Sequence, residues 1–307
     1  MRDNCYIDGE STWAKFGVWM TKGGYSDLLT YPALVEPEKN DWPEEDGVEV
    51  DLSEPCLQEK EITISFLASN PAIDVNDFIA YISAPRYHTL HVPALQREWQ
   101  LRLSAQTTNK RYQNACDFSL KFVEDKPSRR EAIAAPGLYV RDTGYELDGT
   151  PFAKYGVVVD AAKDSLLTSP TAKKNLNSKI STADGQAYDA DHLVFNSKEV
   201  VFKCHFKADS IPAFWSCYDA FFTALVQPDE RDLYVEYIGD SLPCYYKRSS
   251  GFKILKLGGP VLVEFNLTLV FTVFRIGETE YLLASEDGFL IETEDGEFNI
   301  DMKYYGN

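Results

Sequence analysis

Several short segments of this chain occur twice, in the same order and at a nearly constant spacing. The offset stays between 138 and 140 residues, which is the size of a domain and far longer than a solenoid repeat. The sequence of 307 residues therefore predicts two copies of one domain. The clearest matched pairs are Ala14–Val18 with Ala153–Val157, Leu28–Pro32 with Leu166–Pro170, and Lys60–Ile64 with Lys198–Phe202.

Both copies predict the same succession of elements. A strand near residue 16 or 155 leads into a long polar arm, and a strand, a single helix and three further strands follow. The helices carry apolar residues at helical spacing, and the strands alternate apolar and polar residues as in a sheet with one buried face. In residue numbers, we expect arms at 21–57 and 160–196, helices at Ile73–Ala84 and Pro212–Gln227, and closing strands at Thr89–Val92, Trp99–Leu103, Phe118–Phe122, Leu233–Tyr237, Phe252–Leu257 and Val263–Leu269.

The predicted fold class is α+β and mainly β. It consists of two tandem homologous β-sandwich or barrel domains, each with one packed helix and a long loop arm, followed by a C-terminal β-meander. The predicted limits are 1–126 for the first copy, 127–139 for a charged linker with Pro and Gly, and 140–276 for the second copy. Residues 277–307 form the expected acidic hairpin tail, since nine acids and no bases lie between Glu278 and Asp301.

Composition limits the partners and the environment. A net charge of −18 disfavours nucleic-acid binding by phosphate neutralisation. No apolar run is long enough to span a bilayer, and the N-terminus lacks the apolar core of a secretory signal, so we expect no membrane contact. Six cysteines without a C-x-x-C pair predict reduced and mostly buried thiols, which suits a cytosolic origin.

The sequence offers no signature of catalysis or of cofactor binding. It contains no nucleophile elbow, phosphate-binding loop, dinucleotide fingerprint or zinc-protease motif. Its four histidines, at 88, 91, 192 and 205, are scattered, and we interpret them as structural. Four aspartates, at 8, 46, 148 and 184, each precede a glycine and predict turns. We therefore expect no catalytic, cofactor-binding or metal-binding residues, no cofactor, and no enzymatic activity.

The order of elements resembles the tail-tube domain of bacteriophage tails, and most of all the distal tail and baseplate-hub proteins. The residues that carry the likeness are Phe16–Val18, the arm up to Leu57, Ile62–Phe66, Phe78–Ile82 and their matches in the second copy. Ser285–Ile291 is also similar to segments in tail proteins of Bacteroidetes prophages. The likeness covers nearly the whole chain, with one departure. A distal tail protein has one such domain per chain and a different second domain, whereas this chain has two.

The resemblance implies a structural protein of the virion tail, assembled in the bacterial cytoplasm. Such proteins form rings through which DNA passes without being bound, and their extended loops reach the next subunit. We expect self-association into a ring, with a trimer of pseudo-six-fold symmetry favoured over a hexamer, and contacts with other tail proteins. The arms should project from their sheets and stay poorly ordered in an isolated subunit, because they lack the apolar content to form a core.

The alternative is a surface module that binds carbohydrate or peptide. Exposed aromatic side chains such as Trp19, Tyr31 and Trp42 could stack on sugars. The two matched arms discriminate between these hypotheses, because a sugar-binding module has no need of a pair of long polar loops. The arms favour the assembly protein.

Overall fold

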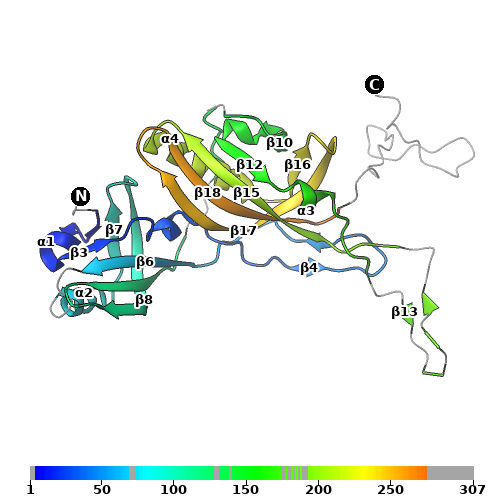
Figure 1. The fold of residues 1–307 in the computed structure, drawn as a ribbon. Helices are drawn as coiled ribbons and strands as arrows, with labels where there is room; N and C mark the ends of the chain where they lie inside the picture. Colours follow the sequence, from blue (N-terminus) through cyan, green and yellow to red (C-terminus); the bar gives the residue numbers. More distant parts are fainter. Residues whose placement is uncertain are drawn as a thin grey trace, which may run out of the picture.

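The computed structural model describes residues 4–68, 74–127, 131–137, 140–173, 177–178, 181–182, 184–185, 187–188 and 193–274. These residues form two seven-stranded antiparallel sheets, one at each end of the body of the molecule (Figure 1). The mainly β, α+β fold class is thereby confirmed. The predicted C-terminal tail, 277–307, and Ile73 at the start of the first expected helix lie outside the described residues.

The two sheets have the same strand order. The first sheet runs β2-β1-β7-β8-β9-β6-β3 and the second β11-β10-β16-β17-β18-β15-β12, so each strand has a counterpart in the other sheet. The first sheet contains β1 (Tyr6–Ile7), β2 (Glu10–Ser11), β3 (Val18–Met20), β6 (Lys60–Ala68), β7 (His88–Val92), β8 (Arg97–Arg111) and β9 (Cys116–Glu124). The second contains β10 (Tyr145–Leu147), β11 (Thr150–Pro151), β12 (Val157–Ala161), β15 (Lys198–Ala208), β16 (Arg231–Val235), β17 (Asp240–Lys256) and β18 (Val261–Phe271).

One principal helix packs on each sheet: α2 (Asp74–Ile82) on the first and α4 (Ile211–Leu225) on the second. Phe78 of α2 meets Phe16 edge-on at 5.5 Å and 60°, and Phe221 of α4 meets Tyr155 at 5.6 Å and 62°. Because Phe16 and Tyr155 are matched by the repeat, the two helices use the same contact to cover their sheets. Helix α2 ends two residues before the predicted end, and α4 begins one residue earlier and ends two residues earlier than predicted.

A matched aspartate fixes the first hairpin of each sheet. Asp8 and Asp148 both have a left-handed backbone (φ 53° and 49°) and precede a glycine. Each carboxylate accepts a hydrogen bond of 2.9 Å from a backbone N–H of the adjacent strand, Thr89 in the first copy and Asp232 in the second. The turns predicted at these two Asp-Gly pairs are confirmed.

The strand expected near residue 16 is wrong in its position. Residues Thr12–Phe16 form a short helix, α1, and the strand β3 begins only at Val18. The Ser11 hydroxyl accepts a hydrogen bond from the N–H of Ala14, and Gly17 ends the helix in the left-handed region, at φ 65°. In the second copy a 3₁₀ turn, η2 (Phe152–Lys154), and Gly156 take the same places before β12.

The closing strands lie where the alternation places them, although β8 and β17 are much longer than predicted. Both contain β-bulges, which interrupt the two-residue period and conceal part of the strand from a sequence pattern. Five of the six cysteines are buried, as expected, and Cys56 is exposed. No helix within the described residues has the length and apolar character needed to cross a bilayer.

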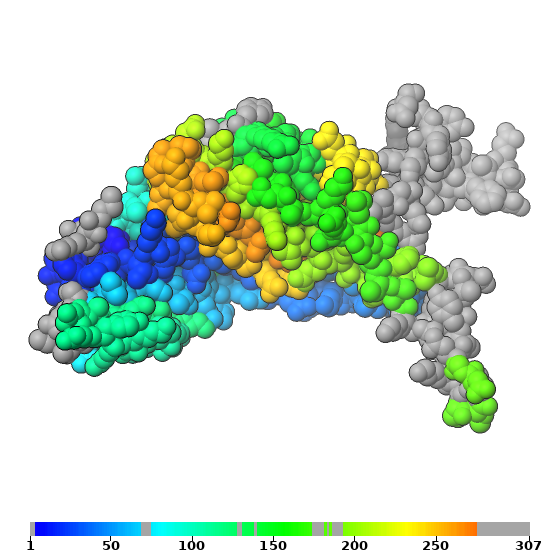
Figure 2. Space-filling view, in the orientation of Figure 1, coloured from blue at the N-terminus to red at the C-terminus, as the bar shows by residue number. Residues whose placement is uncertain are grey.

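The two arms have the same pairing register. In the first, β4 (Lys39–Asn40) pairs with β5 (Glu49–Val50); in the second, β13 (Asn177–Ser178) pairs with β14 (Ala187–Tyr188). Each paired residue of the second arm stands 138 positions after its match in the first. The first arm lies along the second sheet, where Figure 2 shows it as a blue band beneath the green and orange surface, whereas β13 lies away from both sheets (Figure 1).

Candidate assembly interface

A lysine holds the root of each arm: Lys60, which is buried, in the first copy and Lys198, which is half-buried, in the second. Lys60 Nζ donates to the carbonyl of Leu28 at 2.7 Å, and its match Lys198 donates to the carbonyl of Leu166 at 3.0 Å. Burial lowers the pKa of both lysines to about 8, because a charged ammonium loses its hydration there. The two arms therefore leave their sheets through the same polar contact.

Beyond its root, the first arm crosses onto the second copy at Tyr31. The Tyr31 ring stacks on Phe222 of α4, with centroids 4.6 Å apart and planes within 5°, and meets Tyr246 of β17 edge-on at 5.9 Å. The Tyr31 N–H donates to Ser249 Oγ at 3.0 Å. The hydroxyl of Tyr246 donates to the carbonyls of Tyr31 and Pro32, at 3.3 and 3.1 Å. Ring packing and backbone hydrogen bonds thus hold the same short segment.

The chain on either side of Tyr31 is also bound to the second copy. The hydroxyl of Tyr218, in α4, donates to the carbonyl of Leu29 at 2.8 Å. The N–H of Leu34 donates to the carbonyl of Lys247, in β17, at 2.9 Å. Residues 29–34 consequently lie across the open end of the second core, between helix and strand. Leu29 is fully buried there.

The tip of the first arm encloses a lysine of the second copy. Lys173 Nζ donates to the Asp41 carboxylate at 2.6 Å and to the carbonyls of Trp42 and Gly47 at 2.8 and 2.7 Å. The Gly47 N–H donates to the carbonyl of Phe195 at 2.7 Å. Three acceptors around one buried ammonium make a specific contact, because each satisfies a donor that would otherwise be desolvated.

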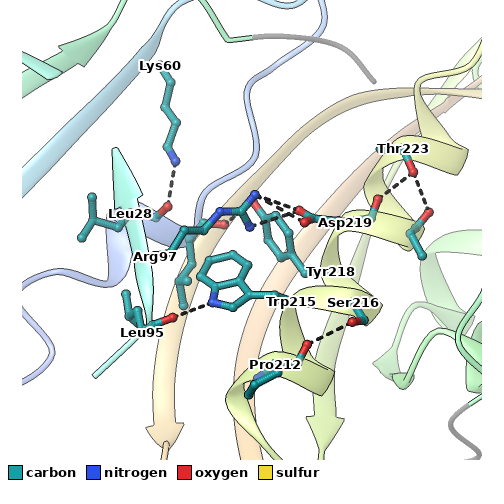
Figure 3. Close-up of polar contacts among 12 residues, drawn as sticks. Leu28, Lys60, Leu95, Arg97, Pro212, Trp215, Ser216, Tyr218, Asp219 and Thr223 are labelled. Carbon is teal, nitrogen blue, oxygen red and sulfur yellow. Dashed lines mark hydrogen bonds and ion pairs between the residues drawn. The ribbon is translucent and has the colours of Figure 1, made fainter. Parts of the chain in front are cut away.

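A second contact joins the first sheet to α4 (Figure 3). Arg97, at the start of β8, forms an ion pair with Asp219 at 3.1 Å, and its guanidinium lies over the Trp215 ring at 4.1 Å. Trp215 Nε1 donates to the carbonyl of Leu95 at 2.6 Å. A basic side chain of one copy is therefore held between an aromatic ring and a carboxylate of the other.

These contacts correct one expectation about the arms. We expected both arms to project and to need a neighbouring subunit, but the first arm is bound by the second copy of the same chain. Its apolar residues are too few for a core of its own, yet Leu29, Leu34 and Leu52 are each no more than 6% exposed because the second copy and the rest of the arm cover them. Much of the tip of the second arm lies outside the described residues.

The aromatic residues proposed as a sugar platform are not brought together. Tyr31 is packed against Phe222 and Tyr246, Trp19 packs edge-on against Trp13 in the first sheet at 4.9 Å, and Trp42 lies at the arm tip, 49% exposed. Sequence reasoning missed the true role of Tyr31. The available signal was the mismatch inside the repeat, where Ser169 occupies the corresponding position.

Each of the three histidines that the structure describes lies beside a carboxylate, and His192 lies outside the described residues. His88 Nδ1 lies 2.7 Å from Asp8, and His205 Nδ1 lies 2.8 Å from Asp160. In the part of the chain that the structure describes, no group of three or more His, Cys, Asp or Glu side chains could hold a metal ion. The contacts that join the two copies are ring packing, hydrogen bonds and ion pairs.

The fold and this interface define a protein built from two like β-rich domains, joined by an arm of the first. No family model matches the chain, and no curated protein matches its sequence. Among solved structures it is similar to the Dit protein (gp 19.1) of phage SPP1, described as a paradigm of the hub adsorption apparatus in phages that infect Gram-positive bacteria. That likeness has 11% identity and a TM-score of 0.31, and it covers 87% of this chain and 98% of the other.

Proposed function

We propose that this chain is a non-enzymatic structural component of a bacteriophage tail, a distal tail or baseplate-hub protein that forms part of a ring around the DNA conduit. The observation that supports this most is the docking of the first arm on the second copy. Tyr31 binds the second copy through ring packing, and Leu34 binds it through a backbone hydrogen bond. The tip of the arm encloses the buried ammonium of Lys173, which belongs to the second copy. An arm that binds the next copy of its own domain is a device for assembly.

The duplication supports a ring of three chains. Two domains with the same strand order can occupy equivalent places around an axis, so three chains would supply six such places. The joint between the copies within one chain would then serve as the pattern for the joints between chains. The likeness in layout to tail-tube domains, noted from the sequence, supports the proposal that this ring belongs to a phage tail.

The charge of the chain suits a conduit. With a net charge of −18, the protein repels phosphate, so DNA would pass the ring without adhering to it. We propose that acidic residues face the pore, that other tail proteins bind the ring on its two sides, and that the ring is a part of the virion.

The test is cross-linking mass spectrometry of intact phage or prophage particles from the strain that encodes the chain. The proposal expects cross-links to other copies of the chain and to tail-tube or baseplate components. Absence of the chain from the particles would contradict it. So would cross-links confined to a sugar-binding tip, which would favour the surface-binding module instead.

A further inference from the structure

The second arm carries a segment, residues 167–172, that matches the docking segment of the first, and five of its six residues are exposed. Leu166, like its match Leu28, is buried at the root of the arm. The next residue differs sharply: Leu29 is fully buried and its carbonyl accepts a hydrogen bond from Tyr218 of the second copy, whereas Leu167 is 48% exposed. An exposed leucine at the position that makes the contact in the other copy indicates a segment without its binding surface.

The first sheet contains the matching receiving surface. Leu103 of β8 corresponds to Tyr246 of β17, because the two residues pair with matched residues of the neighbouring strands. Both strands also have a bulge at the next position, which is Ser104 in β8 and Lys247 in β17. In the first sheet, Phe122 pairs with Ile62 on one side and with Leu103 on the other. In the second sheet, Leu269 pairs in the same way with Val200 and with Tyr246.

That receiving surface is open in the first copy. Tyr246 and Ser249 of the second sheet are buried under the first arm, whereas β8 is exposed at every residue from Ser104 to Arg111. A hollow of about 390 Å³ lies beside Leu103 and Ser104, bounded on its other side by Ile82–Tyr87 at the end of α2. The corresponding side of β17 is where Pro32 and Leu34 lie.

We propose that residues 167–172 of one chain dock on the Leu103–Gln106 segment of a second chain. The inference rests on the proposed self-assembly and names the surface through which it occurs. By analogy with Leu34 and Lys247, the N–H of Ala172 donates to the carbonyl of Ser104 of the second chain. Each chain gives one arm and receives one, which makes a head-to-tail contact, the kind of interface that generates a ring when its rotation closes.

The contact between chains is weaker than the contact within a chain. In the aromatic group formed by Tyr31, Phe222 and Tyr246, the positions of Tyr31 and Tyr246 are taken by Ser169 and Leu103, which bury less apolar surface. The joint inside the chain is thus the stronger one, while the joint between chains depends on protein concentration or on the rest of the tail.

Paired cysteines test the geometry in the full-length chain. In a background with the exposed Cys56 replaced by serine, the S104C/A172C protein is oxidised over a range of concentrations and within particles. We expect disulfide bonds between chains, and mixing S104C chains with A172C chains should give covalent dimers and nothing larger. The matched control is L34C/K247C, which should form its disulfide within one chain. The negative control is S104C/L255C, which pairs two positions that the docking does not bring together and should therefore form no disulfide.

The outcomes separate the docking surface from the assembly itself. The docking surface would be overturned if oligomers or particles contain the chain but no disulfide forms between positions 104 and 172, or if that disulfide forms only within one chain. The proposed function would then remain intact. A chain that neither oligomerises nor enters particles would overturn both.

A second variant tests the leucine directly. Leu167→Asp should raise the dissociation constant of the oligomer about tenfold or more and leave the melting temperature of the monomer unchanged, because Leu167 is exposed in the monomer. Leu29→Asp, at the matched buried position, should instead lower that temperature. Unchanged oligomerisation of L167D would contradict the proposal.

Discussion

Tyr31 lies flat against Phe222, with ring centroids 4.6 Å apart, although one residue belongs to the arm of the first copy and the other to the helix of the second. This stack stands at the centre of the joint between the copies, with Tyr246 at its edge. Offset or stacked aromatic pairs add to the area that their rings bury, so this one position contributes strongly to holding the two domains together.

Replacing Tyr31 by the residue of the matched position should loosen the joint. Tyr31→Ser is expected to lower the free energy of unfolding by about 2–3 kcal/mol and to make the first arm sensitive to limited proteolysis. Chemical denaturation and protease digestion measure the two effects. Tyr112→Ser, at a site that is 59% exposed, is the control and should change neither. Equal behaviour of the two variants would mean that the stack is not important for the joint.

The Arg97–Asp219 pair should couple the first sheet to α4. A double-mutant cycle with Arg97→Met and Asp219→Asn is expected to give a coupling free energy of about 1 kcal/mol, since both side chains are three-quarters buried. The exposed Lys39–Glu36 pair serves as the comparison and should show no measurable coupling. Coupling no larger than in that pair would show that the contact does not stabilise the joint.

The buried lysine at the root of the first arm makes a pH-dependent prediction. The pKa of Lys60 is about 8 in the folded protein and about 10.4 in the unfolded chain, so the unfolded state binds more protons between these values. The contribution of Lys60 to stability therefore rises as the pH increases through this range. Relative to Lys60→Met, the wild-type protein should gain about 2 kcal/mol between pH 7 and pH 9.5.

Denaturant titration of both proteins at the two pH values measures this difference. Other titrating groups are common to the two proteins, so their effects cancel in the comparison. A difference in unfolding free energy that stays constant with pH would mean that Lys60 keeps an ordinary pKa in the folded protein.

The duplicated fold could be predicted because the repeat and the strand alternation are local signals. Apolar residues that recur with a period of two indicate a strand with one buried face. The repeat places Lys60 and Lys198 at the same position of the two copies. The strand expected at Phe16 failed for a local reason as well, since the Ser11 cap and Gly17 define a helix that a repeat comparison does not reveal.

The docking of the first arm could not be predicted in the same way. Whether Leu29 is covered depends on a surface almost 200 positions later, around Tyr218, and no periodicity within the arm reports that contact. The sequence does contain the difference between the arms, because Tyr31 stands where the second copy has Ser169. Only the structure explains that difference, as an aromatic contact made by one arm and not by the other.

Electron microscopy of isolated tails, with this chain labelled, tests the central claim most directly. That claim is that the two copies occupy equivalent places around one axis, joined by one arm within the chain and one between chains. It predicts a ring of six similar lobes made by three labelled chains, with the pore along the axis. A ring in which the two copies lie at different radii, or tails without the label, would contradict it.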